Sequence, residues 1–506
     1  MRHAYQVAAV RTAERGLMDT VPPGALMRRA AAGLSAACAS LLARDPGYVY
    51  GARVLVLAGT GDNGGDALYA GALLARRGAA VTAIAAGPKA HEGGAAELLA
   101  AGGRIFDRAA GGAWRDALFG RADLIIDGLL GIGGRSGLRE PFAGLAALAD
   151  EAGGTVVAVD LPSGIDADTG AVDGPAVRAD VTITFGAIKP GLLIDPGARY
   201  AGTVELVDIG LGPYLPGPPS ALAPQAGDIA DLLPHPSPES DKYRRGVVGL
   251  LAGSDRFAGA AVLATGGAVR GGAGMVRVVT GNVPAAAVRQ AWPEAVVVVH
   301  PDAPGWDLLG SAGRVQAWVA GPGMGTGPDA VARLAAVLGT GLPVLVDADG
   351  LAIISQVPGM LPRPAPTLIT PHAGELARLL GTDAASVEAR RLEHARDAAA
   401  KFGVTVLLKG STTVIAPPFD EPVLVNPTGT SWLATAGTGD VLSGLAGALL
   451  AQGLEPAQAG LAAAYLHGLA ARLAVAGEPG VSWARGEAPI GASDVVRALP
   501  AAFRSL

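Results

Sequence analysis

The sequence predicts an α/β fold divided into two units, each built around a doubly wound, mainly parallel β-sheet. From Arg53 onward, short runs of Val, Leu and Ile alternate with Ala- and Leu-rich stretches of helical length, which is typical of strands buried on both faces between helices. The connections between successive strands are short, which favours parallel pairing through helical crossovers. The 506 residues exceed a single domain, since a domain holds roughly 100–200 residues.

Residues 1–212 form the first expected unit. Its strands lie at residues 53–58, 81–85, 123–127, 155–160, 180–185 and 203–207, and its helices include residues 66–77 and 92–101. Residues 213–224 are rich in proline, which removes backbone donors and prevents regular structure. We therefore expect a linker there.

Residues 225–506 form the second expected unit. Its strands lie at residues 247–252, 275–280, 295–299, 316–320, 344–347, 367–370, 404–409 and 413–416. Helices at residues 440–452, 456–476 and 492–498 close the unit. The two units differ in their motifs and spacing, so we infer no internal repeat.

The composition excludes several classes of function. Lys and Arg number 39 against 45 Asp and Glu, for a formal net charge of −6, so no overall positive field attracts nucleic acid. No run of about 18 apolar residues is present to span a bilayer, and the single cysteine, Cys38, permits no internal disulfide. Charged residues from Arg11 onward interrupt any signal-peptide pattern. We expect a cytoplasmic homo-oligomer that binds small molecules, with no nucleic-acid or membrane partner.

The first candidate site follows the first strand of the first unit. The strand ending at Ala58 leads into a glycine-rich loop, Gly59 to Asp66, at the start of a helix. Glycines let the backbone approach a phosphate, and the helix N-terminus attracts an anion. The carboxylates of Asp62 and Asp66 would repel a bare phosphate, so the loop favours a cation or nucleotide hydroxyls. The GxGxxG spacing is weak evidence by itself, and a simple turn remains an alternative.

Two later strand ends strengthen the first site. Asp127 opens a glycine-rich segment, and Asp160 opens a Leu-Pro-Ser-Gly segment that contains Ser163. The carboxyl ends of strands in a doubly wound sheet share one crevice. Oxygen atoms of Asn63, Asp127 and Ser163 could therefore enclose a hard cation. The alternative for Asp127 or Asp160 taken singly is a helix cap or turn residue.

These motifs, together with Lys189-Pro190-Gly191, resemble the NAD(P)H-hydrate epimerase domain over residues 1–210. The loop departs from the usual motif by carrying Asp62 where the family commonly has Asn, and Ala67 where it commonly has Gly. The resemblance implies a Rossmann-like fold that interconverts the R and S forms of NADH hydrate and NADPH hydrate. It implies potassium held by Asn63, Asp127 and Ser163. It also implies dinucleotide contacts from Asp62, Asn63, Gly64, Gly65, Asp66, Gly131, Ile132, Gly133, Gly134, Arg135, Ser136, Gly137 and Asp160.

Epimerisation at C6 of the nicotinamide ring needs proton transfer at the C6 oxygen, whether the hydroxyl leaves or the ring opens. We expect Asp127 and Lys89, which follows the second strand, to be the catalytic residues. The alternative for Lys89 is an ordinary solvated lysine.

The second candidate site is a glycine turn from Thr435 to Asp440, which leads into an apolar helix. Consecutive backbone N–H groups from Ala436 to Asp440 can form an anion nest that neutralises a transferring phosphoryl group. A carboxylate beside that nest does not favour phosphate binding. We therefore expect Asp440 to act as the base toward the hydroxyl that attacks phosphorus; the alternative is a helix N-cap.

Three further segments lie at strand ends of the second unit. Lys409 opens a Lys-Gly-Ser-Thr-Thr group that could hold a nucleotide through its ammonium, hydroxyl and backbone donors. Gly321 opens a Gly-Pro-Gly-Met-Gly loop, and His372 lies in a Thr-Pro-His-Ala-Gly-Glu segment.

These segments resemble the ribokinase-like superfamily and, more closely, the ADP- or ATP-dependent NAD(P)H-hydrate dehydratase family, over residues 225–504. The resemblance implies a ribokinase-like α/β/α sandwich, with ADP and magnesium as cofactors. It implies contacts to the hydrated nucleotide from Ala260, Gly323, His372 and Asp440, and to ADP from Lys409, Gly410, Ser411, Thr412, Thr413 and Gly439. Residues 426–432 depart from the sequence that is usual in this family.

The fusion of the two units resembles the bacterial bifunctional NAD(P)H-hydrate repair enzymes. In that interpretation the first unit supplies the S hydrate, and the second dehydrates it to NAD(P)H, giving AMP and phosphate. A small-molecule kinase with a nucleotide-sensing N-terminal domain is the enzymatic alternative, and it would accumulate a phosphate ester. A non-catalytic nucleotide- or partner-binding protein is the third hypothesis.

Overall fold

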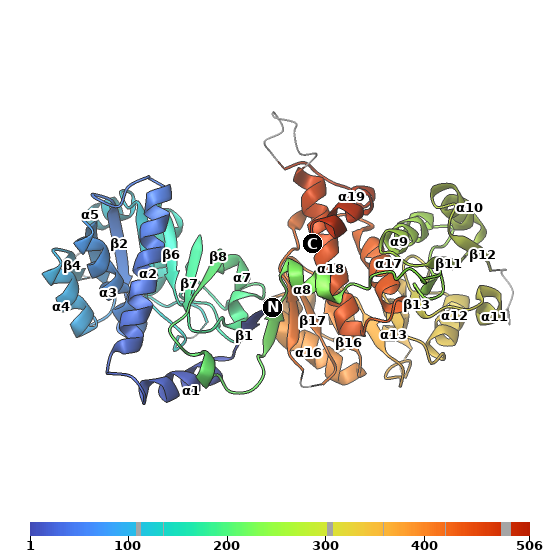
Figure 1. Cartoon of the computed structure of the whole chain (residues 1–506), viewed down its shortest axis with the longest axis horizontal. Coiled ribbons are helices and arrows are strands. Elements are labelled where there is room, and N and C mark those ends of the chain that lie inside the picture. Colours follow the sequence, from blue (N-terminus) through green and yellow to red (C-terminus); the bar gives the residue numbers. More distant parts are fainter. Residues whose placement is uncertain (108–112, 135, 301–306, 358, 420, 477–486) are drawn as a thin grey trace. The chain divides into compact units, whose positions relative to one another are not determined.

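A computed structural model describes residues 1–107, 113–134, 136–300, 307–357, 359–419, 421–476 and 487–506 (Figure 1). The chain divides into two compact units, one made of His3–Ala221 and the other of Met1–Arg2 with Leu222–Leu506. The amino-terminal ammonium group pairs with Asp228 at 2.6 Å, so the first two residues belong with the second unit. The predicted α/β class is confirmed in both units.

The unit His3–Ala221 contains a seven-stranded sheet in the order β4-β3-β2-β5-β6-β7-β8. Every pairing between these neighbours is parallel. The strands are β2 (Arg53–Ala58), β3 (Ala80–Ala85), β4 (Arg104–Asp107), β5 (Leu124–Gly128), β6 (Thr155–Val159), β7 (Val181–Phe185) and β8 (Thr203–Val207). The helices are α1 (Val7–Met18), α2 (Ala25–Arg44), α3 (Asp62–Arg76), α4 (Glu92–Ala100), α5 (Ala113–Phe119), α6 (Phe142–Asp150) and α7 (Ala198–Ala201).

Alternate residues of β2 show why this sheet is covered on both faces. Val54 and Val56 pack in one buried cluster with α2 and α3. Leu55 and Leu57 pack in another cluster with α6. Because successive side chains of a strand point to opposite faces, the continuous apolar run at residues 54–58 requires helices on both sides. This burial fixes the carboxyl ends of the strands at one edge, where the glycine-rich loops begin.

The second unit contains an eleven-stranded sheet in the order β1-β9-β18-β17-β16-β15-β14-β13-β10-β11-β12. Pairing is parallel from β16 through β12, while β17 pairs antiparallel with both β16 and β18. The strands are β1 (Arg2–Ala4), β9 (Ala221–Ala223), β10 (Val247–Leu251), β11 (Met275–Thr280), β12 (Val296–Val299), β13 (Ala317–Ala320), β14 (Val344–Val346), β15 (Thr367–Ile369), β16 (Thr405–Leu408), β17 (Thr413–Ala416) and β18 (Val423–Asn426).

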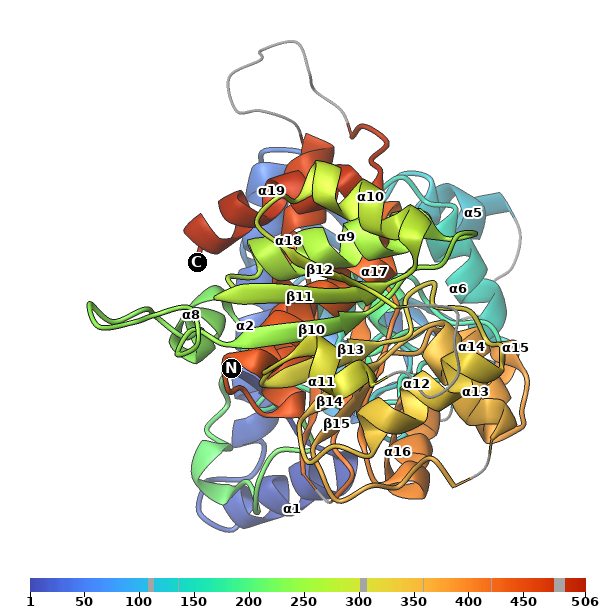
Figure 2. The same cartoon turned by 90° about the vertical axis from the view of Figure 1, so that its right-hand side faces the viewer.

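Helices cover both faces of this sheet, with α9, α17 and α18 on one side and α12, α13 and α16 on the other (Figure 2). The helices are α8 (Ala226–Leu232), α9 (Ala258–Arg270), α10 (Asn282–Ala291), α11 (Leu308–Ala312), α12 (Pro328–Leu338), α13 (Asp349–Gln356), α14 (Ala373–Leu380), α15 (Ala384–Ala389), α16 (Arg391–Phe402), α17 (Thr438–Ala451), α18 (Pro456–Ala476) and α19 (Ala492–Arg504).

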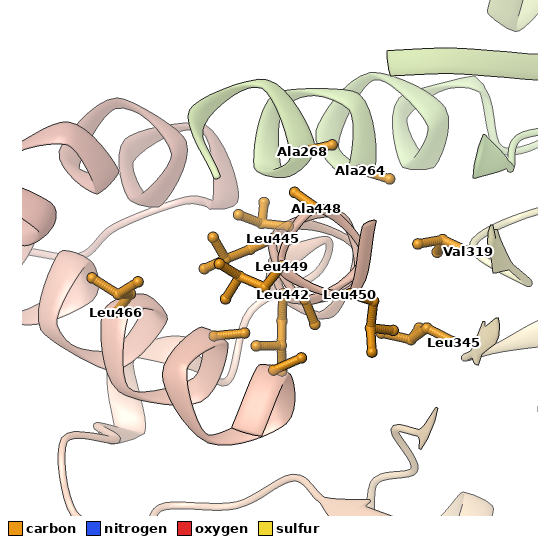
Figure 3. Packing of buried hydrophobic residues seen from close by; sticks show 14 of the residues in the cluster. Ala264, Ala268, Val319, Leu345, Leu442, Leu445, Ala448, Leu449, Leu450 and Leu466 are labelled. Carbon is orange, nitrogen blue, oxygen red and sulfur yellow. The ribbon is translucent and has the colours of Figure 1, made fainter. Parts of the chain in front are cut away.

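Helix α17 lies at the centre of the core of the second unit, as Figure 3 shows. It is apolar on all sides, which is typical of a fully buried helix. Two glycines allow it to approach α9 closely: a Cβ at Gly444 would lie 1.9 Å from the carbonyl oxygen of Ala264, and one at Gly267 would lie 2.1 Å from that of Val441. Its side chains pack against Ala264, Ala268, Val319, Leu345 and Leu466. This packing fixes the position of the helix that carries the glycine turn.

Helix α18 is the one helix of the described residues that is long and apolar enough to cross a membrane. Within its most apolar window, 72% is buried inside the protein. It is thus accounted for as a core helix.

Some elements differ from the expected ones. Strands β1, β4, β9 and β18 were not predicted. They are short strands of three or four residues, and tertiary pairing rather than a long apolar run defines them. Helix α3 begins at Asp62 rather than Asp66, and α17 at Thr438 rather than Asp440. In both cases the glycine turn itself winds into the first helical turn.

Candidate active sites

The N-terminus of α17 presents Asp440 in its first turn. Gly437 has the left-handed φ of 89° that ends the preceding turn, a conformation that glycine adopts without strain. The Thr438 hydroxyl donates to the carbonyls of Leu433 and Thr435 at 2.8 and 3.0 Å, which closes the turn. Within the described residues, Asp440 makes no capping hydrogen bond to its own helix, so the N-cap interpretation finds no support.

An ion network built around the buried Asp347 lies beside Asp440. The Lys409 ammonium donates to Asp347 at 2.7 Å and lies 3.6 Å from Glu375. The other Asp347 oxygen accepts a hydrogen bond from Ser443 at 2.6 Å. Asp347 follows β14, Lys409 follows β16, and Ser443 lies on α17, so three elements of the core fix this network.

Burial and charge raise the pKa of Asp440 to about 7. Burial is the largest cause; the negative charges of Asp347 and Asp349 raise the pKa further, while Lys409 lowers it. A carboxyl group that titrates near neutral pH suits a general base. The arrangement can therefore accept a proton beside a turn of backbone N–H donors.

Gly439 leaves open space in this turn. A Cβ at this position would lie 3.5 Å from the Lys409 nitrogen and 3.8 Å from Asp347 Oδ2. Its φ is not left-handed, so backbone strain does not account for the glycine. The space beside the ammonium group and the helix N-terminus is suited to an anionic group.

Ala260 and Gly323 come together at the start of α9. A Cβ on Gly323 would lie 2.8 Å from the Cβ of Ala260, and Gly323 has a left-handed φ of 60°. Gly321 is more crowded, because a Cβ there would lie 1.8 Å from the carbonyl oxygen of Asp347. The glycine loop thus brings the α9 start and the Asp347 backbone into one region.

His372 caps the N-terminus of α14. Its Nδ1 accepts hydrogen bonds from the backbone N–H groups of Gly374 and Glu375, at 3.0 and 3.4 Å. In return, the Glu375 carboxylate accepts a hydrogen bond from the backbone N–H of His372 at 2.8 Å. The imidazole is exposed, and its Nε2 lies 3.6 Å from Glu375 Oε1.

The predicted nucleotide-binding group begins at Lys409 and turns sharply at Gly410. The Thr413 hydroxyl donates to the Gly410 carbonyl at 3.2 Å, which closes the turn. Gly410 and Ser411 are exposed, Thr412 is half-buried and Thr413 is buried. The exposed part of the turn can meet a ligand, whereas Thr413 supports the turn from inside.

The first unit holds Asp127 and Ser163 in direct contact. Asp127 is completely buried and accepts hydrogen bonds from the Ser163 hydroxyl at 2.7 Å and from the Ser163 N–H at 2.8 Å. The Leu129 N–H adds a third at 3.2 Å. Burial raises the pKa of Asp127 to about 6, against these hydrogen bonds, which lower it. Within the described residues no basic side chain pairs with Asp127.

Close backbone contacts shape the crevice beside this pair. A Cβ at Gly59 would lie 1.9 Å from the Leu129 carbonyl oxygen, one at Gly64 would lie 2.2 Å from the Gly59 carbonyl oxygen, and one at Gly131 would lie 2.9 Å from Asn63 Oδ1. A cavity of about 420 Å³ opens here. The predicted residues that line it are Asp62, Asn63, Asp66, Gly131, Ile132, Gly133, Gly134 and Asp160.

Asp160 pairs with a buried lysine. Its carboxylate accepts a hydrogen bond from Lys189, and also from the Thr184 hydroxyl at 3.2 Å and the Phe185 N–H at 3.1 Å. Asp160 has a left-handed φ of 66°, which is uncommon for a residue other than glycine. The backbone strain is held by this ion pair at the cavity wall.

The structure does not bring every predicted residue of the first unit to the cavity. Lys89 is exposed in the connection between β3 and α4, and it does not line the cavity. Ser136 donates to the Ala171 carbonyl at 3.1 Å, and the Gly137 N–H donates to the Gly164 carbonyl at 2.9 Å, so both fasten the loop to its neighbour. Gly65 is buried against His91. Arg135 lies outside the described residues.

Comparison with known proteins gives matches to both units. Residues 248–484 match the family described as NAD(P)H-hydrate dehydratase, and residues 23–191 match the one described as YjeF-related protein N-terminus. The bifunctional NAD(P)H-hydrate repair enzyme of Mycobacterium leprae (strain TN) is 46% identical over 509 residues, covering 100% of each chain. The chain belongs to the family of bifunctional NAD(P)H-hydrate repair enzymes.

A second repair enzyme and a solved dehydratase structure are also similar to this chain. The repair enzyme of Mycobacterium tuberculosis (strain CDC 1551 / Oshkosh) is 46% identical over 462 residues, or 91% of each chain. The solved ADP/ATP-dependent NAD(P)H-hydrate dehydratase of Bacillus subtilis, crystallised with ATP and Mg²⁺, is 31% identical, with a TM-score of 0.48. That likeness covers 55% of this chain and 96% of the other.

Sequence reasoning missed several side chains of this repair-enzyme family member. Asp347 ends a predicted strand as Asp127 and Asp160 do, and the rule that strand ends share a crevice would have found it. Lys189 was noticed only through its motif, and no signal indicated that it is buried against Asp160. Arg391, whose guanidinium donates a hydrogen bond to the backbone carbonyl of Lys409, 18 residues away, left no local pattern.

Proposed function

We propose that this protein repairs hydrated nicotinamide cofactors. One unit interconverts the R and S forms of NADH hydrate and NADPH hydrate, and the other dehydrates the S form with ADP as phosphoryl donor, giving NAD(P)H, AMP and phosphate. The full-length match to repair enzymes supports this function over a small-molecule kinase with a nucleotide-sensing N-terminal domain. The structural observation that carries this proposal is that the Asp440 carboxylate lies near Lys409 and does not cap its own helix.

In the dehydration step, Asp440 takes the proton of the C6 hydroxyl as that oxygen attacks the terminal phosphorus of ADP. The bond from this phosphorus to the bridging oxygen breaks, and AMP leaves. Phosphate is a better leaving group than hydroxide. Loss of phosphate from C6 and of a proton from C5 then restores the C5=C6 double bond.

The dehydratase unit uses an adenine nucleotide with magnesium. The described residues contain no group of three or more His, Cys, Asp or Glu side chains placed to hold a metal ion, which fits an ion held largely by the nucleotide phosphates. When bound, Mg²⁺ neutralises the phosphoryl oxygens. Lys409 and the N-terminus of α17 add positive charge on the protein side.

Potassium in the epimerase unit is supported by the charge of its expected ligands. Asp127 is a buried carboxylate whose hydrogen-bond donors, Ser163 and Leu129, are neutral, and a cation would balance its charge. Asn63 lies against the same loop, next to Gly131. Replacing K⁺ by Li⁺ should lower the rate of R-to-S conversion and leave the wild-type rate of S dehydration unchanged when ADP and Mg²⁺ are present.

The decisive experiment incubates the purified protein with mixed R and S hydrates, with and without ADP, and follows both epimers by chromatography. With ADP, both epimers should disappear while NAD(P)H, AMP and phosphate appear. Loss of S alone would contradict the epimerase function, and a stable phosphate ester would identify a kinase.

We also propose that the protein acts in the cytoplasm as a homo-oligomer. Cell fractionation and light scattering of the purified chain test these two statements separately.

A further inference from the structure

Asp66 is a carboxyl group that the proposed mechanism does not yet use. It lies in the second turn of α3, and its Oδ1 atom is buried without a hydrogen-bond partner. A buried acceptor left unpaired is destabilising, so its presence calls for an explanation.

Asp66 lies where two cavities meet. The first is the glycine-walled cavity of about 420 Å³ described above. The second, of about 620 Å³, is lined by apolar side chains that include Leu26, Met27 and Ile209. Asp66 lines both cavities, as do Glu14, Asp62 and Phe185.

The walls of the two cavities differ in a way that suits the two ends of a hydrated dinucleotide. The first has the backbone of Gly131 to Gly134 and Arg11, which are suited to phosphates. The carboxylates of Asp62 and Asp160 in the same wall are suited to nucleotide hydroxyls. The second has an apolar wall and the edge-to-face ring pair of Tyr69 and His91, 5.8 Å apart, which suits a flat ring. A ligand that spans both cavities passes Asp66.

The residues expected to transfer the proton are less well placed. Asp127 is completely buried and bonded to Ser163, and it lines neither cavity. Lys89 is exposed and lines neither of them. Asp66 therefore has access to the ligand that these two residues lack.

We propose that Asp66 is the proton-transfer residue of the epimerase unit, an inference that rests on the proposed function. The Asp66 carboxyl group donates its proton to the C6 hydroxyl, the C6–O bond breaks, and water leaves while the N1 lone pair forms an iminium bond to C6. Water then adds to the opposite face of C6 and returns a proton to the Asp66 carboxylate. No oxidant or reductant enters this cycle.

The charges around Asp66 support this role. Burial, and the nearby carboxylates of Asp160, Asp62 and Glu14, raise its pKa well above the ordinary value, which favours the protonated form that an acid requires. The same carboxylates would stabilise the iminium cation as it forms. Among the described residues, the basic groups at this region include Lys189, which pairs with Asp160, and Arg11, whose side chain donates to the Ile132 carbonyl at 3.4 Å. The imidazole of His91 lines the second cavity.

The test compares wild type, Asp66→Asn and Glu151→Gln on the R hydrate without ADP. Asp66→Asn should lower the R-to-S rate by about 100-fold or more, the usual range for loss of a general acid–base group. Glu151 is an exposed carboxyl group after α6, outside both cavities, and its variant should match wild type. All three proteins should dehydrate the S hydrate with ADP at the same rate.

The outcomes separate the two proposals. If wild type does not convert R to S, the epimerase function fails; if wild type converts and Asp66→Asn converts equally fast, the role of Asp66 fails. Should Asp66→Asn unfold the first unit, the wild-type pH profile decides. kcat/KM for R-to-S conversion should fall as pH rises through the raised pKa of the acid, and Asp66→Glu should move the midpoint of that fall. A flat profile would overturn the proposal.

Discussion

The guanidinium of Arg391 donates a hydrogen bond to the backbone carbonyl of Lys409, 2.7 Å away. It also donates to the Leu408 carbonyl at 3.2 Å and pairs with Glu388 at 2.7 Å. Gly410 provides the room, since a Cβ there would lie 2.2 Å from the guanidinium. A fully buried arginine thus holds the turn that directs Lys409 toward Asp347.

Arg391→Lys should loosen this turn. Lysine keeps the charge but has no planar fork to reach both carbonyls and Glu388 together. Each carbonyl left without a donor should reduce the free energy of unfolding by about 1–3 kcal/mol, and the KM for ADP should rise more than kcat falls. Arg497→Lys, at an exposed ion pair on α19 with the same sequence spacing, is the matched control and should stay within about 0.5 kcal/mol of wild type. Unchanged ADP kinetics in Arg391→Lys would contradict the positioning role.

Asp440→Asn should slow dehydration strongly and stabilise the second unit at the same time. Removing the base should lower the rate about 100- to 10,000-fold. The folded-state pKa of about 7 is raised from 3.8, so stability falls as pH rises between those values, and the destabilisation is complete above pH 7. Asparagine carries no charge and removes this destabilisation, so the free energy of unfolding should rise by on the order of 2–4 kcal/mol at pH 8. Denaturant unfolding at pH 8 and near pH 4 measures this difference, which should vanish at the lower pH. A helix-capping aspartate would give the opposite result, because its loss destabilises the helix.

The sequence was sufficient for the fold class and for the strand ends that carry the sites. Continuous apolar runs such as residues 54–58 require a sheet covered on both faces, and the glycine turns mark where its loops approach a ligand. The antiparallel strand β18 was missed because its four residues become a strand only through pairing with β17.

Side-chain partners were harder to predict than strand ends. The expected catalytic group Lys89 and the buried Lys189 are both lysines near strand ends, and nothing in their neighbours distinguishes exposure from burial. The burial of Lys189 against Asp160 depends on Thr184 and Phe185, which lie on another strand. Likewise, the unpaired oxygen of Asp66 is a property of the folded cavity and not of the loop motif.

Gly439→Ala should preserve folding while impairing the reaction with ADP. The Cβ meets Lys409 and Asp347 only at ordinary contact distances of 3.5 and 3.8 Å, and alanine favours helix by up to about 1 kcal/mol over glycine. The methyl group nevertheless occupies the space next to the Lys409 ammonium, where a phosphate is expected. The thermal unfolding temperature should be unchanged or slightly higher, whereas the KM for ADP should rise at least tenfold. Gly437→Ala provides a contrast, because the left-handed φ of 89° makes that variant strained and less stable. Normal ADP kinetics in a well-folded Gly439→Ala protein would argue against phosphate binding at this turn.

The two activities should respond to pH in opposite directions within one chain. Asp440 acts as a base, so its active form is the carboxylate; with a pKa of about 7, kcat/KM for dehydration should rise about tenfold per pH unit below 7 and level off above it. Asp66 acts as an acid, and its active form is protonated, so R-to-S conversion should fall as pH rises through its raised pKa. Lys409 lowers the pKa of Asp440, and Lys409→Gln should therefore move the rise in dehydration to higher pH without altering the epimerase profile. Measuring both activities on the same preparation, from pH 5 to 9, provides the check: if the profiles rise and fall together, a shared unfolding event rather than two separate carboxyl groups governs them.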